Sequence, residues 1–321
     1  MEESPKFYGM REWYMKDPDG YILCFGQETG VEQSMMSFFN RLLFGNFIKL
    51  LNLFFLLSLF YPLLPMQAKT PENIPEQVLE GVQLFKAGQF ETSFELLKPF
   101  AKKGNPRAQF TLGLLYDMGG IRLMDKRKAV EWYRKAAEQG LADAQYDMGV
   151  MRSKGEGIAK DLIKAQDWYR KAAQQGHGFS MFNLGVLNER GYGVEVNINK
   201  AVHWYQAAAD KGVAKAAFNL AHLYYTGSGV NKDFKRAFEL YKQAAEKDHK
   251  GAQYYLAWMY QQGEGVNKSS LEAERWYREA AINGNTKAMW NYALLLQKAG
   301  KLKQADEWKR RFKQKQTKIA P

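Results

Sequence analysis

Small and apolar residues recur along most of the chain with a fixed period of 36 residues. One register holds a small residue, at Ala108, Ala144, Ser180, Ala216, Ala252 and Ala288. Another holds an aromatic pair, at Trp132-Tyr133, Trp168-Tyr169, Trp204-Tyr205, Leu240-Tyr241 and Trp276-Tyr277. A period of this length is typical of solenoids, in which each unit buries its apolar face against its neighbours. The pattern therefore predicts five copies of one structural unit over residues 108–287.

Each copy predicts two helices joined by a short loop. In the second half of a copy, Ala165, Tyr169, Ala172 and Ala173 fall on one helical face. A helix N-cap residue precedes that half in every copy, namely Asp125, Asp161, Asn197, Asp233 and Ser269. The second helix is expected to stop at Gly140, Gly176, Gly212, Asp248 and Gly284. A Gly-x-Gly pair such as Gly155/Gly157 ends the first helix, because glycine tolerates positive φ.

The order of these features resembles the Sel1-like repeat, a relative of the tetratricopeptide repeat. The shared sequence is a small residue, Leu-Gly, Gly-x-Gly-Val, Asp-x-x-Lys-Ala, Trp-Tyr, Ala-Ala and Gly, and residues 144–287 match it well. The resemblance implies an all-α, right-handed superhelical solenoid of helix-turn-helix repeats. The first helices would line the concave inner face and the second helices the outer face. It also implies a scaffold or adaptor for protein–protein interaction, and many bacterial members are exported.

The two ends of the array depart from the 36-residue pattern. Residues 69–107 fit a shorter, tetratricopeptide-like capping unit with Gly81, Ala87-Gly88 and Ala101 in register. Residues 288–321 predict C-terminal capping helices and a basic tail, with 8 basic and 2 acidic groups from residue 301 onward. Atypical terminal units are expected, because the outermost faces of an open solenoid have no neighbour.

Residues 35–68 read as a targeting segment. Arg41 and Lys49 precede an apolar run of 15 residues, Leu50–Leu64, and Ala68 follows it. A bilayer span needs about 20 apolar residues, so the run suits a signal peptide cleaved near Ala68. The expected location is periplasmic or secreted. An uncleaved anchor in the inner membrane, with the array facing the periplasm, and a buried core helix are the alternatives.

Residues 1–34 stand before that signal. Asp17-Pro18-Asp19-Gly20 predicts a turn between two strand-like runs. Residues 9–26 resemble the last hairpin of the glyoxalase/bleomycin-resistance superfamily. Cys24 falls near the place of that family's metal-binding glutamate and is a poor substitute at an oxygen-rich site. The segment is interpreted as a fusion remnant or as the product of a start codon placed too early.

Composition and motifs favour a non-enzymatic protein. The chain has 46% hydrophobic and 25% charged residues, which disfavours extensive disorder and a multi-span membrane protein. The lone cysteine excludes a disulfide scaffold and cysteine-based metal sites. Nucleotide-binding and nucleophile motifs are absent, and the 4 histidines share no metal-binding spacing. No catalytic residue, cofactor or metal ligand is therefore expected.

In the related tetratricopeptide fold, ligands contact defined positions of the first helix. Carried over by register, the resemblance implies that the candidate partner-binding residues are the inner positions that change from copy to copy. They are Lys154, Glu189, Arg190, His222, Tyr225, Trp258 and Gln261. His222, Tyr225 and Trp258 are expected to form an aromatic patch beside Arg190 and Lys154, because aromatic and arginine residues are typical interface anchors. A further register, Phe110, Tyr146, Phe182, Phe218, Tyr254 and Trp290, stays aromatic throughout and is interpreted as packing between repeats.

The net charge of +12 favours an anionic partner without naming one. The first expectation is a protein or peptide on the concave face. The alternative is an acidic envelope polysaccharide or similar polymer held by basic and aromatic residues. Nucleic acid is not expected if the chain is exported, and the membrane is a partner only through the N-terminal segment if that segment stays uncleaved.

Overall fold

The computed structural model describes residues 13–16, 22–25, 74–118 and 124–317. The predicted signal segment 35–68 lies outside these residues, as does the predicted turn 17–20. In the described part, two short strands pair antiparallel, β1 (Trp13–Lys16) and β2 (Ile22–Phe25), with Trp13 opposite Phe25. The described residues from Glu76 onward form fourteen helices, α3 to α16. The predicted all-α solenoid of helix pairs is confirmed.

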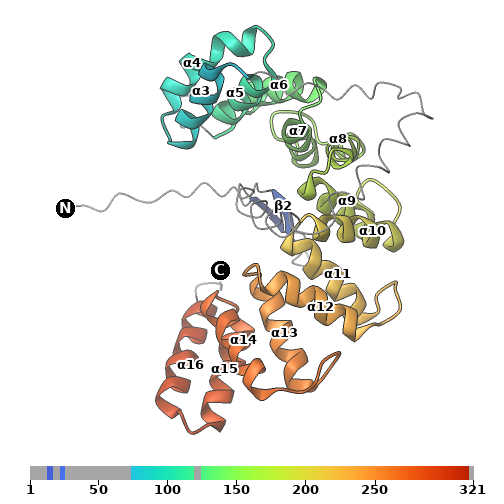
Figure 1. Cartoon of the computed structure of the whole chain (residues 1–321), viewed down its shortest axis with the longest axis vertical. Coiled ribbons are helices and arrows are strands. Elements are labelled where there is room, and N and C mark those ends of the chain that lie inside the picture. The colour runs from blue at the N-terminus through green and yellow to red at the C-terminus, as the bar shows by residue number, and fades with distance from the viewer. Residues whose placement is uncertain (1–12, 17–21, 26–73, 119–123, 318–321) are drawn as a thin grey trace, which may run out of the picture.

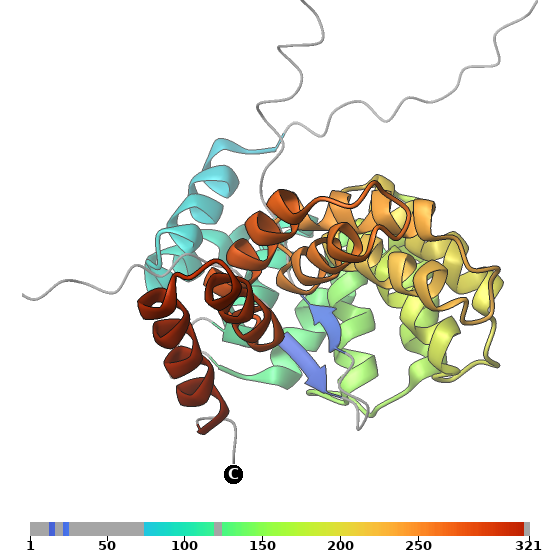
Figure 2. The same ribbon diagram turned by 90° about the horizontal axis from the view of Figure 1, so that it is seen from below.

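The helices alternate between two rows of a curved stack (Figure 1). The inner row is α5 (Pro106–Met118), α7 (Ala142–Lys154), α9 (Gly178–Arg190), α11 (Ala214–Thr226), α13 (Lys250–Gln262) and α15 (Thr286–Lys298). The outer row is α6 (Lys126–Glu138), α8 (Leu162–Gln174), α10 (Ile198–Asp210), α12 (Phe234–Ala245), α14 (Ser270–Ile282) and α16 (Leu302–Thr317). Each inner helix packs on the outer helix that follows it, and that helix packs on the next inner one. Seen from below, the pairs trace an arc rather than a straight row (Figure 2).

The predicted caps delimit the helices. The Asp161 carboxylate accepts a hydrogen bond from the Lys164 backbone N–H at 2.9 Å, and the Asn197 amide oxygen does the same for Lys200. Inner helices α7, α9, α11 and α13 each end at a glycine in the left-handed region, such as Gly155 with φ 78°. Asp248 takes the glycine position after α12 with φ 58°. The cap residues and glycines that recur every 36 residues in the sequence thus mark the beginnings and ends of the helices.

Five tyrosines of the outer row form the centre of the core. They are Tyr133, Tyr169, Tyr205, Tyr241 and Tyr277, and each is at most 1% exposed. The rings of Tyr133, Tyr169 and Tyr205 each lie on a glycine of the preceding inner helix, because a side chain there would take the space of the ring. A Cβ atom on Gly149 would stand 2.5 Å from the Tyr169 ring, and Gly185 meets Tyr205 in the same way.

The constant aromatic register, for which packing between repeats was expected, makes its ring contacts with the core tyrosine mainly inside one repeat. Its rings contact the core tyrosine that follows 23 positions later, with centroid separations of 5.7 Å for Phe110–Tyr133, 5.8 Å for Phe182–Tyr205 and 5.8 Å for Tyr254–Tyr277. At the last position Trp290 meets Phe312 of α16 instead, at 5.3 Å. These contacts join each inner helix to the outer helix of the same pair.

Shorter units cover the two ends of the array. The N-terminal pair is α3 (Glu76–Lys86) and α4 (Phe90–Lys102), where Leu97 packs against Gly81. At the other end α16 covers α15 through Trp308 and Tyr292, whose rings lie 5.6 Å apart. Among the described residues, no helix has the length and apolar character to cross a bilayer.

Candidate functional site

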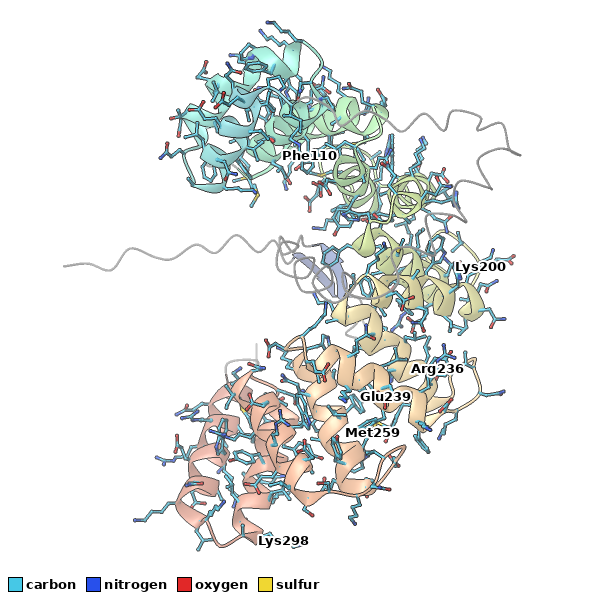
Figure 3. All side chains as sticks on the ribbon, in the orientation of Figure 1. Phe110, Lys200, Arg236, Glu239, Met259 and Lys298 are labelled. Carbon is cyan, nitrogen blue, oxygen red and sulfur yellow. The ribbon has the colours of Figure 1, made fainter. Side chains whose placement is uncertain are left out.

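The inner row exposes one narrow stripe of side chains. Most other faces of these helices are buried against the outer helices that precede and follow them. Lys200 and Arg236, by contrast, belong to outer helices α10 and α12 and lie on the convex side (Figure 3). A ligand in the curve of the solenoid would therefore meet the inner stripe.

Three predicted residues meet in an inner aromatic cluster, which we define as His222, Tyr225, Tyr255 and Trp258. Tyr255 is its centre, with ring centroids 5.6 Å from His222 and 5.8 Å from Tyr225. Trp258 lies close enough to the Tyr225 hydroxyl to act on its pKa, which it lowers. All four side chains are half-buried, so each keeps part of its surface in solvent. The three aromatic residues predicted for the patch therefore lie together across α11 and α13, whereas Lys154 and Arg190 belong to α7 and α9.

The core beneath the cluster holds its rings in place. Tyr255 stacks on the buried Tyr241 ring at 5.0 Å with an interplanar angle of 5°. The Tyr241 hydroxyl and His222 Nδ1 are 3.2 Å apart. Burial lowers the pKa of His222, so its ring is neutral at pH 7. An ordered ring surface loses little side-chain entropy on binding, which favours recognition.

Glu264 anchors the cluster at one edge. The Tyr225 hydroxyl donates a hydrogen bond to Glu264 Oε2 at 2.9 Å, from the loop after α13. Burial and then the Glu264 carboxylate raise the pKa of Tyr225 to about 12. The phenol is consequently protonated at neutral pH and acts as a donor rather than as a nucleophile.

Glu189 and Gln261 have a structural partner that sequence reasoning missed. Glu189 Oε2 accepts a hydrogen bond from the Tyr205 hydroxyl at 2.5 Å, and Gln261 Oε1 accepts one from Tyr277 at 2.8 Å. These residues occupy the register where the inner helix meets the phenol of the buried tyrosine 16 positions later. The residue type at this inner position varies between repeats partly because different side chains can accept a hydrogen bond from the hydroxyl group of the recurring tyrosine.

Lys154 lies in a separate charged group at the loops of the first two repeats. Its Nζ is 3.6 Å from a carboxylate oxygen of Glu156, which also pairs with Lys126 at 3.0 Å. Lys126 in turn pairs with Asp117. Arg190 ends α9, where its charge acts on the Tyr205 phenol. Lys154 ends α7, two repeats before the helix that carries His222 and Tyr225.

Two histidines act as helix caps. His177 and His249 precede α9 and α13, and the Nδ1 atom of each accepts a backbone N–H, from Ser180 at 3.2 Å and from Ala252 at 3.1 Å. Burial and then the charges of Lys215 and Lys250 lower the pKa of His249 to about 4. A neutral ring is what the cap requires, because a protonated Nδ1 cannot accept.

No cluster of three His, Cys, Asp or Glu side chains with metal-binding geometry occurs among the described residues. Several tyrosines, including Tyr169, Tyr225 and Tyr277, have raised pKa values and remain neutral donors.

Sequence reasoning also missed Tyr255. The inner register that it occupies holds Asp147, Asn183, Asn219, Tyr255 and Asn291, so it is the one aromatic residue among short polar side chains. That departure from the register was a signal, and it could have identified the centre of the cluster.

Comparisons with known proteins agree with this architecture. The family profile described as the Sel1 repeat matches residues 106–141, 142–177, 178–213, 214–249 and 251–285. A Sel1 repeat protein from Oxalobacter formigenes is 36% identical with a TM-score of 0.64, and the match covers 74% of this chain and 97% of that one. The protective antigen c5321, present in uropathogenic Escherichia coli strains and described as displaying an SLR fold, is 32% identical with a TM-score of 0.67. That match covers 74% of this chain and 53% of the antigen. No curated protein sequence matches the chain.

Proposed function

Because the chain belongs to the Sel1 repeat family, we propose that it is an exported scaffold that binds a segment of a partner protein on its inner face. Sel1-repeat proteins commonly bind proteins, and the fold is typically a non-enzymatic scaffold. The observation that carries the proposal is the inner aromatic cluster, whose half-buried rings are held by partly buried hydrogen bonds on an otherwise uniform framework.

The physical case is that ordered aromatic side chains make good interface anchors. Tyrosine and tryptophan bury large areas with few rotatable bonds and offer a polar atom at the edge. Tyr225 and Trp258 both have this character, and Glu264 keeps the Tyr225 ring from rotating freely. Their place on the inner row lets one ligand touch several repeats at once.

A photo-crosslinking residue in place of Trp258 tests this function in cells. A crosslinked protein is expected from that position, and the same residue in place of Lys235, exposed on outer helix α12, is the matched control. Adducts from position 235 alone would show that the partner binds outside, and the proposal would be wrong.

Export is the second part of the proposal. It rests on the apolar run Leu50–Leu64 and its basic flank, which lie outside the described residues. Mass spectrometry of the native N-terminus in separated cell fractions tests it. A start near Lys69 in the periplasm or medium supports cleavage, an intact segment in the inner membrane supports the anchor, and a cytosolic start at Met1 contradicts export.

Acidic polymer binding is the other candidate function. Basic groups stand over aromatic rings on the outer row, with Lys135 Nζ 4.3 Å from the Trp132 centroid and Lys171 Nζ 4.3 Å from Trp168. Such a polymer would contact many lysines at once, so its binding should weaken steeply with salt. Protein binding through the inner aromatic cluster should respond to salt much less.

A further inference from the structure

A row of lysines borders the inner aromatic cluster. Lys215, Lys250 and Lys287 stand in the first turns of α11, α13 and α15, at the same end of three successive inner helices. The Lys250 and Lys287 side chains are exposed, and neither forms an ion pair with a carboxylate of the described residues. We call these three residues the lysine rim.

The charges of this lysine rim act on the pKa of a neighbouring histidine. His249 lies beside it, and the charges of Lys215 and Lys250 both add to burial in lowering its pKa. At the opposite edge, Glu264 adds to burial in raising the pKa of Tyr225. Lysines therefore stand at one edge of the inner surface of these repeats, and the Glu264 carboxylate stands at the other.

The exposed rings continue from the cluster toward the C-terminal end. On α15, Lys287, Trp290 and Leu294 fall at i, i+3 and i+7, on one side of the helix. Trp290 is 40% exposed and Leu294 44% exposed, and Phe312 supports the Trp290 ring at 5.3 Å. Both are large apolar side chains left accessible in a molecule whose other inner apolar positions are mostly covered.

We infer that the inner face of α11, α13 and α15 binds an extended, acidic protein segment that carries aromatic or large aliphatic side chains. The carboxylates of the segment meet the lysine rim, and its apolar side chains lie on Tyr255, Trp258 and Trp290. This inference deepens the proposed function and rests on it, since it assigns the chemistry of the partner.

Charge and size both favour this occupant. A basic segment would bring its charges against three lysines, whereas an acidic one is attracted and aligned by them. Packed helices lie about 8–10 Å apart, so three inner helices span about 20 Å. An extended chain covers that length in about six residues, at about 3.3 Å each. A short linear segment is thus sufficient to contact all three helices.

Random copolymers supply a defined probe. Binding of fluorescein-labelled poly(Glu,Tyr) to the full chain is measured by fluorescence anisotropy in 150 mM salt, beside poly-Glu and poly(Lys,Tyr). Poly(Glu,Tyr) is expected to bind at least tenfold more tightly than either other polymer, because it alone offers both carboxylates and rings.

Matched variants locate the site. The rim variant Lys250→Ala/Lys287→Ala and the ring variant Trp258→Ala should each weaken poly(Glu,Tyr) binding at least tenfold. The control Lys200→Ala/Lys235→Ala removes the same charge from exposed positions of the outer row and should change it less than twofold. Circular dichroism and the thermal midpoint of each variant confirm folding, and the two rim lysines are surface residues whose loss leaves the core intact.

The outcomes separate this inference from the proposed function. Equal weakening by the rim and outer variants would mean general charge attraction and would overturn the inference. If Trp258→Ala weakens binding and the rim variant does not, the inner face binds but the acidic assignment fails. If neither inner variant changes binding, the inner face is not the binding surface and the proposed function fails with it.

Discussion

A histidine at the start of α13 ties the stability of one repeat to pH. The cap register of the inner helices holds Asn105, Leu141, His177, Val213, His249 and Asn285. Histidine and asparagine are its side-chain caps, and both accept the N–H of the residue three positions later. Asparagine accepts the helix N–H at any pH, whereas histidine accepts it only while neutral.

The His249→Asn variant is expected to resist mild acid better than the native chain. The pKa of His249 is about 4 in the folded state and about 6.5 when unfolded, so the unfolded state binds the proton first. The stability from the neutral ring is complete above pH 6.5 and is lost as the pH falls toward 4. Between pH 6.5 and 5 this group alone lowers the free energy of unfolding by about 2 kcal/mol.

Urea unfolding of both proteins at pH 7.5 and pH 5.0 measures this effect. At pH 7.5 the two should have similar midpoints, since asparagine replaces the cap. If the drop between the two pH values is the same in both proteins, the buried neutral cap does not govern the acid response. His177→Asn provides an independent second site, because burial also lowers the pKa of His177, opposed by Asp143 at 3.7 Å.

At the scale of the helices, one residue in the turn after each outer helix adopts a left-handed backbone conformation, and the chain there turns into the next inner helix. Glycine occupies this place in four repeats with positive φ, and Asp248 occupies it with φ 58°. A non-glycine residue in the left-handed region is strained by its Cβ atom.

Asp248→Gly should therefore stabilise the α12–α13 turn by about 1 kcal/mol. The converse test is Gly140→Ala, where φ is 94° and nothing lies within 4 Å of the added Cβ, so that only backbone strain is introduced. That variant should be destabilised by a similar amount. Thermal midpoints that shift in the same direction for both substitutions would contradict a backbone origin.

Helix boundaries were predictable because they depend on residues a few positions apart. Asp161 caps α8 and Gly155 ends α7 through local backbone geometry, which the sequence displays directly. The hydrogen bonds of Glu189 and Gln261 were not predictable in the same way. Each forms with a tyrosine hydroxyl 16 residues later in the chain, on the adjacent outer helix. It therefore depends on how closely the inner and outer helices pack.

The candidate site was predictable only in part for the same reason. His222, Tyr225 and Trp258 share an inner face by register, and the structure brings them together. Lys154 shares that face by register too, but it pairs with Glu156 at the loops two repeats away. Periodicity gives the face of a helix, whereas contacts between repeats depend on the curvature of the stack.

At the scale of the whole molecule, each helix is stabilised mainly by packing on its neighbours in the stack. The ends of such an array open first, because a terminal unit has one neighbour instead of two. Here α16 supplies the last cover through Trp308 and Phe312.

Trp308→Ala/Phe312→Ala should therefore loosen the C-terminal end selectively. Amide hydrogen exchange in α15 is expected to accelerate at least tenfold, which corresponds to about 1.4 kcal/mol of lost protection. Exchange in α5 and α7, at the other end of the array, should stay unchanged. Uniform acceleration of exchange along the chain would show that the array unfolds as a single cooperative unit and would contradict opening from the end.

Recognition of a protein segment by the inner aromatic cluster is best tested by the affinity of the partner crosslinked through position 258. Its dissociation constant is compared by calorimetry for the native chain, Tyr225→Ala/Trp258→Ala and the outer control Lys200→Ala/Lys235→Ala. Loss of two anchors should cost about 2 kcal/mol or more, roughly a 30-fold weaker complex, while the control stays within twofold. Native affinity in a correctly folded Tyr225→Ala/Trp258→Ala protein would contradict the inner face as the binding surface.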